Sequence, residues 1–317
     1  MVKSISFFKK LFNAIIISFL TQLRKIRGFD SQFIIFSPFT RNRRSWALWK
    51  IKVCLPLFDL DINLKRRVSS NIPLDVFIPI SSKDFSSLKR VVDSVKKHIK
   101  HPINSIYIVS ANDDPILAFC RNEGLIFIDE NRMLGYNKSR IDYKHENKDR
   151  SGWLFQQLLK LNSDTICQTE NILILDADTF FVRPRIFIKN KKFIMDQSEE
   201  RHEPYHNVYS KILGRKTTSS LSFITHYMVF NKSILTELKQ KIEKIHNCKW
   251  DEVIIKYNDY SSGSGFSEYE LYGNFIYEHY HKNVSLAYWF NININADTYP
   301  NYIKSVSLHS YLKNELA

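Results

Sequence analysis

The sequence contains little glycine, little proline and no close pair of cysteines. With 8 Gly and 9 Pro against 23 Phe and 16 Tyr in 317 residues, it indicates a globular protein and excludes a collagen-like or low-complexity chain. The four cysteines lie far apart, without a CxxC or paired Cys/His pattern, so neither a zinc site nor a disulfide framework is indicated. The cysteine usage favours a reducing, cytosolic setting.

Positive charge is unevenly distributed along the chain. The formal net charge is +14, and residues 1–67 hold fourteen Lys and Arg against three acids, a net charge of +11. The remaining 250 residues therefore carry only +3. Because a nucleic-acid binder places its basic charge on the folded domain, we expect no nucleic-acid partner.

The basic segment has the pattern of an amphipathic helix. Its densest apolar run, residues 14–20, is interrupted by Ser18 and falls short of the roughly 20 residues that a membrane-spanning helix needs. Residues 41–52 place two tryptophans among five cations, as in a protein that binds an anionic membrane surface. We therefore expect residues 1–67 to be a membrane-association segment. A secretory signal and a helix packed on its own domain are the alternatives.

From residue 72 the pattern changes to alternating short strands and helices, which is typical of a mostly parallel α/β sheet. Residues 68–317 are therefore predicted to form one domain. Strands are expected at residues 75–80, 106–110, 125–129, 172–175 and 222–230, and helices at residues 85–99, 153–161, 234–245 and 268–281.

The most specific motif is a pair of acids after an apolar run. Residues 172–175 predict a strand buried on both faces, and Asp176 and Asp178 follow it directly. Ligands of open α/β sheets bind at the carboxyl ends of the strands. Carboxylates at this spacing suit Mg²⁺ or Mn²⁺, which complete their coordination with water and phosphate oxygens. The motif predicts a metal site for a diphosphate.

The motifs together resemble the glycosyltransferases of the GT-A fold over roughly residues 72–312. The resemblance is carried by IPI at residues 78–80, RSGWLFQQLLKL at 150–161, LDADTFFVRP at 175–184, FITHYMVFN at 223–231 and GFSEYELYGNF at 265–275. It implies a nucleotide-diphosphate sugar as donor and a glycan or lipid-linked glycan as acceptor. The pattern looks like a branch associated with bacterial polysaccharide and lipopolysaccharide synthesis.

The resemblance also implies roles for single residues. Asp178 would bind the metal directly, while Asp176 would contact ribose or the waters of the metal. His309 would supply a further metal ligand, unless it is an ordinary surface or core histidine, and a histidine ligand favours Mn²⁺ over Mg²⁺. The loop at residues 79–84 would bind base and ribose, with Pro79 and Ser82 as contacts and Asp84 as a helix cap. Ala177 of the acidic motif would lie against the donor.

The expected helix at residues 153–161 begins with groups suited to phosphate. Arg150 precedes its free backbone amides, where a cation and the helix N-terminus both favour an anion. Trp153 and Gln157 follow at helical spacing, and Gln157 adjoins another glutamine in an otherwise apolar helix. We expect these side chains to contact the donor, although Trp153 also suits a core position.

Two further pairs of residues are candidates for the acceptor side. Ser267 and Glu270 form a capping box, which accounts for Glu270, whereas Glu268 has no such explanation. Glu268 is therefore the predicted general base, with Glu270 as the alternative. His226 and Tyr227 lie within an expected strand and are either core residues or acceptor contacts.

The sequence thus predicts a metal-dependent glycosyltransferase, peripherally bound at the inner face of the cytoplasmic membrane and active in cell-surface polysaccharide synthesis. A sugar-phosphate or nucleotidyl transferase is an alternative, but it would usually show a glycine-rich phosphate loop. A nonenzymatic membrane-surface binding protein is another.

Overall fold

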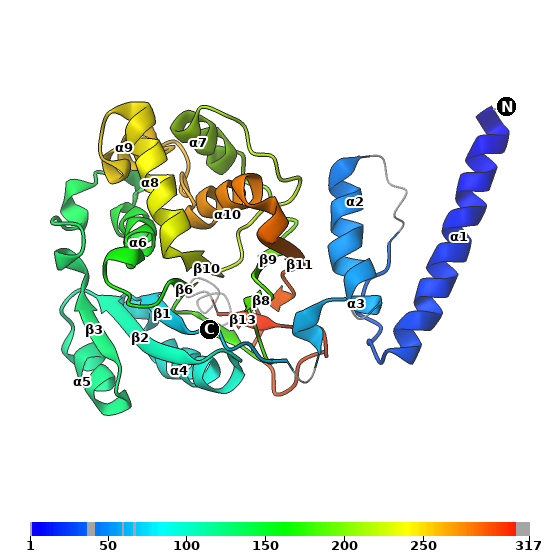
Figure 1. The fold of residues 1–317 in the computed structure, drawn as a ribbon, viewed down its shortest axis with the longest axis horizontal. Coiled ribbons are helices and arrows are strands. Elements are labelled where there is room, and N and C mark those ends of the chain that lie inside the picture. The colour runs from blue at the N-terminus through cyan, green and yellow to red at the C-terminus, as the bar shows by residue number, and fades with distance from the viewer. Residues whose placement is uncertain (1, 37–41, 59, 66–67, 309–317) are drawn as a thin grey trace.

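The computed structural model describes residues 2–36, 42–58, 60–65 and 68–308, with side chains from residue 11 onward. An α/β body carries an N-terminal helical extension on one side (Figure 1). The helices are α1 (Val2–Ile26), α2 (Arg43–Trp49), α3 (Leu55–Leu57), α4 (Phe85–His98), α5 (Asp114–Glu123), α6 (Ser151–Leu161), α7 (Glu203–Leu213), α8 (Lys232–His246), α9 (Trp250–Tyr257) and α10 (Glu268–His279).

The central sheet has five strands in the order β10-β6-β1-β2-β3. These are β1 (Leu74–Pro79), β2 (Ile103–Ser110), β3 (Ile126–Asp129), β6 (Asn171–Leu175) and β10 (Tyr227–Asn231). All neighbours are parallel except β10, which runs antiparallel to β6. The predicted fold class, a mostly parallel sheet flanked by helices, is confirmed.

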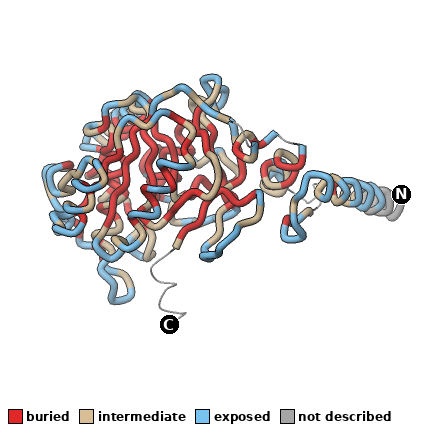
Figure 2. The backbone as a smooth tube through the Cα atoms, turned by 90° about the horizontal axis from the view of Figure 1, so that it is seen from below, coloured by how far each residue is buried: buried red, intermediate tan, exposed pale blue. Residues whose placement is uncertain are grey.

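Both faces of this sheet are buried, as its apolar strands require. Phe77 of β1 faces a core formed with α6 and α7 to α10, whereas Val76 and Ile78 face a core formed with α4 and α5. Figure 2 shows the buried strands running through the middle of the body. Leu88 and Val95 lie on the buried face of α4, as the apolar spacing of that helix predicts.

Two smaller sheets lie beside the central one. One has the order β11-β9-β8, and the other has the order β12-β13-β7. Their strands are β7 (Thr179–Phe181), β8 (Ile188–Lys189), β9 (Lys192–Gln197), β11 (Val284–Tyr288), β12 (Asn291–Ile292) and β13 (Ser305–Ser307), and a separate hairpin pairs β4 (Lys144–His145) with β5 (Lys148–Asp149).

Only the second half of the strand expected at residues 222–230 is present in the structure. Regular pairing begins at Tyr227, because the preceding residues are engaged elsewhere. Ser222 pairs with Ser198, and both the Ser222 hydroxyl and the Phe223 amide donate to the Glu270 carboxylate. Helices α5, α7 and α9 were not predicted from the sequence, although Asp113 at the start of α5 and Gly124 after its end are ordinary helix boundary residues.

The N-terminal extension packs against the body at more than one place, and Phe33 contacts Phe290 and Tyr302. Ile51, Val53 and Leu57 are buried in a cluster with Tyr288 and Phe290. Of the sequence alternatives for this segment, packing on its own domain therefore describes Phe33 and residues 51–57.

A buried ionic cluster then ties the extension to the body. Asp61 lies 2.8 Å from the Nζ of Lys304, which is also 3.2 Å from Asp196, and Asp196 pairs with Arg185 at 2.6 Å. All four side chains are at most 1% exposed. The cluster holds two negative and two positive groups, so its formal charge is balanced only while Asp61 is in place.

Candidate functional site

The acids of the sequence motif lie at the edge of the sheet where the parallel strands end. Asp176 follows β6, and His226 precedes β10. Because β10 is antiparallel to β6 and pairs Tyr227 with Leu175, the residue before one strand meets the residue after the other. The Asp176 amide donates to the His226 carbonyl at 3.0 Å. The topology therefore brings a histidine to the acidic motif.

Asp176, Asp178 and His226 form a group that could hold a metal ion. One ligand atom from each lies within 4.8 Å of the others, and all three residues are partly exposed. They line a pocket of about 430 Å³. Two carboxylates with an imidazole suit a divalent cation that tolerates both oxygen and nitrogen ligands, as Mn²⁺ does. The residues present thus fit a divalent cation.

Several protein side chains hold the carboxylate of Asp176. Both carboxylate oxygens of Asp176 accept hydrogen bonds from protein groups, Oδ1 from Lys160 at 2.5 Å and from Tyr269 at 3.0 Å, and Oδ2 from His226 Nδ1 at 3.0 Å. Burial tends to raise the pKa of Asp176, but Lys160 and His226 hold it well below its ordinary value. Asp176 is therefore ionised, and it fixes the orientation of the imidazole.

His226 is held in an unusual conformation. Its φ of 56° lies in the left-handed region, which is uncommon for residues other than glycine. The ring stacks on Trp289 with centroids 5.1 Å apart. Burial tends to lower the pKa of His226, but the hydrogen bond and charge of Asp176 raise it above the ordinary value. Backbone strain of this kind is concentrated at functional sites.

A buried lysine lies behind the acidic motif. Lys160 near the end of α6 is 4% exposed, and its Nζ is 2.7 Å from Oε1 of Glu268 as well as close to Asp176. Burial opposes its charge, but the two carboxylates raise its pKa above the ordinary value, so it is a cation. Lys160, which also lines the metal-site pocket, therefore partly neutralises Asp176.

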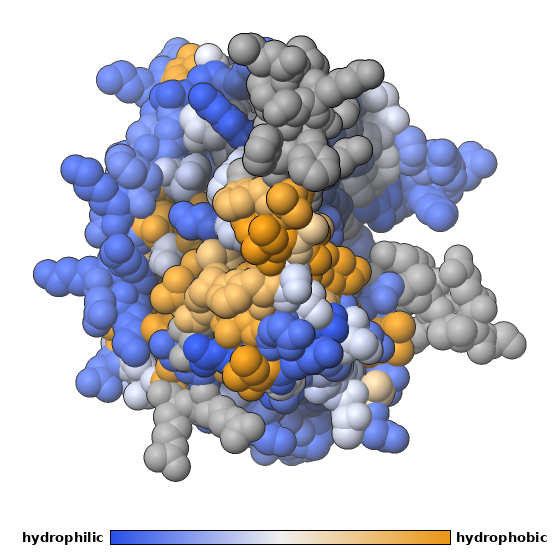
Figure 3. Space-filling model, turned by 90° about the vertical axis from the view of Figure 1, so that its right-hand side faces the viewer, coloured by the Kyte–Doolittle hydropathy of each residue, from blue (hydrophilic) through white to orange (hydrophobic). Residues whose placement is uncertain are grey.

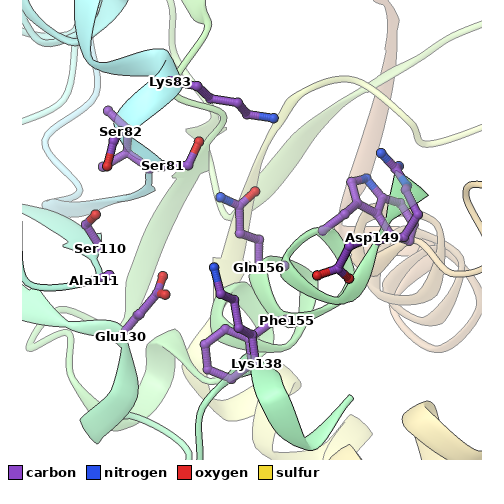
Figure 4. A pocket seen from close by; sticks show the side chains of 14 residues that line it. Ser81, Ser82, Lys83, Ser110, Ala111, Glu130, Lys138, Asp149, Phe155 and Gln156 are labelled. Atoms are coloured by element: carbon purple, nitrogen blue, oxygen red, sulfur yellow. The ribbon is translucent and has the colours of Figure 1, made fainter. Parts of the chain in front are cut away.

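A second pocket adjoins the first. It measures about 400 Å³ and shares Lys83, Arg150, Trp153 and Gln156 with the metal-site pocket. Residues after β1, β2 and β3 line it, and Figure 4 shows Ser81, Ser110, Glu130 and Gln156 around the same space. The two pockets form one cleft along the carboxyl ends of the strands, where ligands of open α/β sheets bind.

The structure places most of the predicted donor contacts in this cleft. Trp153 and Gln157 extend from one face of α6, and Arg150 lies just before that helix. Arg150 is positioned by its Nε donating to the Gly263 carbonyl at 2.6 Å and by lying over the Trp153 ring. Pro79 and Ala177 line the metal-site pocket, whereas Ser82 lines the second pocket.

Three predicted acceptor residues lie outside the cleft. Glu268 is 1% exposed, lines neither pocket, and faces Lys160, so burial raises its pKa despite that partner. Glu270 is also buried, and its carboxylate accepts from Ser222 and Phe223. Tyr227 points to the other face of β10, where its hydroxyl donates to Asp196 at 2.7 Å. His309 lies outside the described residues.

Sequence reasoning missed two acids that line the metal-site pocket. Asp84 was expected to cap a helix, and it occupies the N-cap position of α4, but its side chain accepts from the Ser81 hydroxyl at 2.9 Å instead of capping an amide, and it lines the pocket. Glu200, in the loop after β9, lines the same pocket with an exposed side chain. It had no sequence signal, because it follows another glutamate in an irregular segment.

A protein-family model matches most of the chain. The model describes a family of unknown function, DUF6492, and it matches residues 72–306. No curated protein sequence matches the chain.

Solved structures resemble the fold at low sequence identity. The crystal structure of mouse xyloside xylosyltransferase 1 in its apo form matches with 9% identity and a TM-score of 0.42, covering 76% of this chain and 99% of that chain. An active-site mutant of LgtC matches with 15% identity and a TM-score of 0.43, covering 74% of this chain and 86% of that chain. At these values, function has to be argued from the site.

Proposed function

The chain belongs to DUF6492, a family of unknown function, so we propose its activity from the geometry of the cleft. We propose that it is a metal-dependent glycosyltransferase of the GT-A type, which uses a nucleotide-diphosphate sugar. The observation that carries this proposal is the continuity of two pockets, one with a cation-binding group and one without. A nucleotide sugar has the same division, with a nucleoside at one end and a diphosphate in the middle.

Cationic side chains lie where the two pockets join. Lys83 and Arg150 line both pockets, so they can pair with phosphate oxygens between the nucleoside and the metal group. The second pocket then receives base and ribose, with Trp153 as an aromatic surface and Ser82 and Glu130 as hydrogen-bonding groups. The order nucleoside, diphosphate, sugar therefore places the sugar beyond the metal group, near His226 and Glu200.

We assign unequal roles to the residues of the metal group. Asp178 would bind the cation directly, and His226 would bind through Nε2, because its Nδ1 is engaged by Asp176. Asp176 orients His226 and is held by Lys160, rather than being a principal ligand. A bound Mn²⁺ or Mg²⁺ would neutralise charge that develops on the leaving diphosphate. Mn²⁺ fits better, because one ligand is an imidazole.

Glu200 is better placed than Glu268 to accept a proton from the acceptor hydroxyl. It lines the metal-site pocket with Tyr205 and Ile224, and it is exposed, whereas Glu268 is buried and paired with Lys160. A general base must reach the proton that it removes. Because Glu268 is buried and ion-paired with Lys160, we assign it a structural role instead of that of general base.

We expect Glu200→Gln to lower the transfer rate by about 10² to 10⁴-fold, the usual contribution of a general base. Donor affinity should change little, because the substitution preserves side-chain shape and lies outside the metal group. Transfer assays and calorimetry on the same preparation measure the two effects. Glu268→Gln is the matched control, and it should lower thermal stability. Unchanged transfer by the Glu200 variant would exclude this role.

We expect one nucleotide-diphosphate sugar to bind the chain only when Mn²⁺ or Mg²⁺ is present. Isothermal titration against a panel of nucleotide sugars, with and without each cation, measures this directly. The corresponding nucleoside monophosphate should bind more weakly, because it lacks the diphosphate that bridges Lys83, Arg150 and the metal group. If every donor binds equally well in a chelator, or none binds with a cation, the proposal fails.

The acceptor is proposed to be a glycan or a lipid-linked glycan in bacterial polysaccharide or lipopolysaccharide synthesis. Such acceptors are presented at the inner face of the cytoplasmic membrane, where the strongly basic segment at residues 1–67 favours an anionic surface. Incubation with lipid-linked glycan extracts and labelled donor, followed by separation of the lipid products, tests this assignment.

A further inference from the structure

Helix α1 has two apolar faces that differ in their surroundings. On one face Leu20 is 2% exposed and packs with Ile16 and Leu23 in the cluster that joins the extension to the body. On the other face Leu11, Ile15, Phe19 and Ile26 are 48%, 57%, 58% and 79% exposed. Spacings of four, four and seven residues place these four on one side of the helix.

An exposed apolar stripe of this kind is costly for a helix in water. The surface side of a helix in a globular protein is normally polar, and contiguous exposed apolar residues mark an interaction site. In Figure 1, α1 stands apart from the α/β body, and Figure 3 shows hydrophobic residues gathered on this side of the molecule. None of the helices in the described part of the chain is both long and apolar enough to cross a membrane.

The geometry points to the outward stripe of α1, formed by Leu11, Ile15, Phe19 and Ile26, as the docking surface for an anionic lipid bilayer. With 25 residues and a rise of 1.5 Å each, α1 is about 37 Å long and would lie in the plane of the membrane interface.

The positive charge around α1 favours an anionic bilayer as the partner of the outward stripe. Lys25 and Arg27 are exposed at the end of α1, and Arg43 and Lys50 are exposed near α2. These cations belong to a segment with a net charge of +11, which is attracted to acidic headgroups. A second copy would bring two such segments together, and their like charges would repel.

The docking helix is fixed to the body rather than tethered to it. After α1 the chain turns back, and Phe33 packs against Tyr302 with ring centroids 5.2 Å apart and against Phe290 at 6.1 Å. Arg24 also donates to the Phe33 carbonyl at 3.3 Å. Docking of the outward stripe would therefore fix the orientation of the cleft relative to the membrane.

The test is co-sedimentation of the full chain with vesicles of phosphatidylcholine mixed with phosphatidylglycerol. The triple variant Leu11→Ser, Ile15→Ser, Phe19→Ser should lose more than about 100-fold in vesicle affinity, since each buried side chain contributes roughly tenfold. Its melting temperature should stay near that of the parent, because these side chains are exposed. Leu20→Ala on the inner face should instead lower the melting temperature.

Charge and oligomerisation supply two further outcomes. Vesicles of phosphatidylcholine alone should bind the parent chain more weakly, and Lys25→Gln with Arg27→Gln should weaken binding to the mixed vesicles about fivefold per residue. Sedimentation of the triple variant equal to that of the parent would overturn the proposal. The proposal would also be overturned if the parent chain formed a dimer without lipid and the triple variant did not. The triple variant should bind nucleotide sugars with the affinity of the parent chain, so failure of the docking proposal can be distinguished from failure of the proposed activity.

Discussion

Asp178→Asn is expected to lower the affinity of the chain for Mn²⁺ by at least about 100-fold. Loss of a residue that only supports a metal ligand already costs about 10 to 100-fold, so loss of a direct ligand should cost no less. Transfer should fall by about a thousandfold or more, because the cation contributes several kcal/mol to stabilising the leaving diphosphate. Titration of Mn²⁺ in the absence of any sugar measures the first effect.

Asparagine at position 178 is conservative for the fold. The backbone carbonyl still accepts from the Leu308 amide at 2.9 Å, and the side-chain carbonyl can still accept from the Thr179 hydroxyl. The melting temperature should therefore stay close to that of the parent. Glu200→Gln, at the same pocket but outside the metal group, is the matched control and should keep cation affinity. Mn²⁺ affinity of Asp178→Asn equal to that of the parent would contradict the metal site.

The acidic motif could be placed from sequence because its position depends on one local pattern. An apolar run at residues 172–175 had to be a buried strand, and two acids at its end had to lie at the edge of the sheet. His226 could not be placed in this way. Its contact with Asp176 depends on β10 running antiparallel to β6, and on a positive φ that no local pattern of residues 222–230 indicates.

The two glutamates considered as general base show a second limit of sequence reasoning. The sequence favours Glu268, at the start of an expected helix, over Glu200 in an irregular segment, and only tertiary packing shows which of them lines the cleft. The start of α10 is covered by the body, so Glu268 is buried and paired with Lys160. From the sequence, Lys160 is an ordinary lysine in an apolar helix, because its partners Asp176 and Glu268 lie 16 and 108 positions away.

The basic N-terminal segment was predicted as a unit distinct from the domain, but its two parts behave differently in the structure. Helix α1 presents apolar residues to the outside, whereas Asp61 and Asn63 reach into the body. Asn63 accepts from the Ile186 amide at 2.9 Å, and Asp61 pairs with Lys304. The net charge of the segment does not reveal this difference, because Asp61 and its partner Lys304 are 243 positions apart in the sequence.

Asp61→Asn is expected to destabilise the protein by about 3 to 5 kcal/mol, the cost of leaving a buried charge without its partner. Asparagine can still accept from the Asn63 amide, so the local turn is preserved, but its NH2 group then faces Lys304, which loses both the negative charge and the acceptor oxygen. The cluster would then hold Lys304 and Arg185 against Asp196 alone. Thermal unfolding should show a melting temperature lower by roughly 5 to 8 °C.

Glu123→Gln provides the matched control for Asp61→Asn. Glu123 also pairs with lysines, Lys96 at 3.0 Å and Lys89 at 3.4 Å, but the pairs lie at the surface, where such interactions contribute less than about 1 kcal/mol. Equal shifts in melting temperature for the two variants would contradict the buried cluster. The double variant Asp61→Asn, Lys304→Met should recover most of the lost stability, because removal of both charges leaves Arg185 and Asp196 as a balanced pair. Recovery by Lys304→Met shows that the loss in Asp61→Asn comes from an uncompensated charge, and not from a change in packing at position 61.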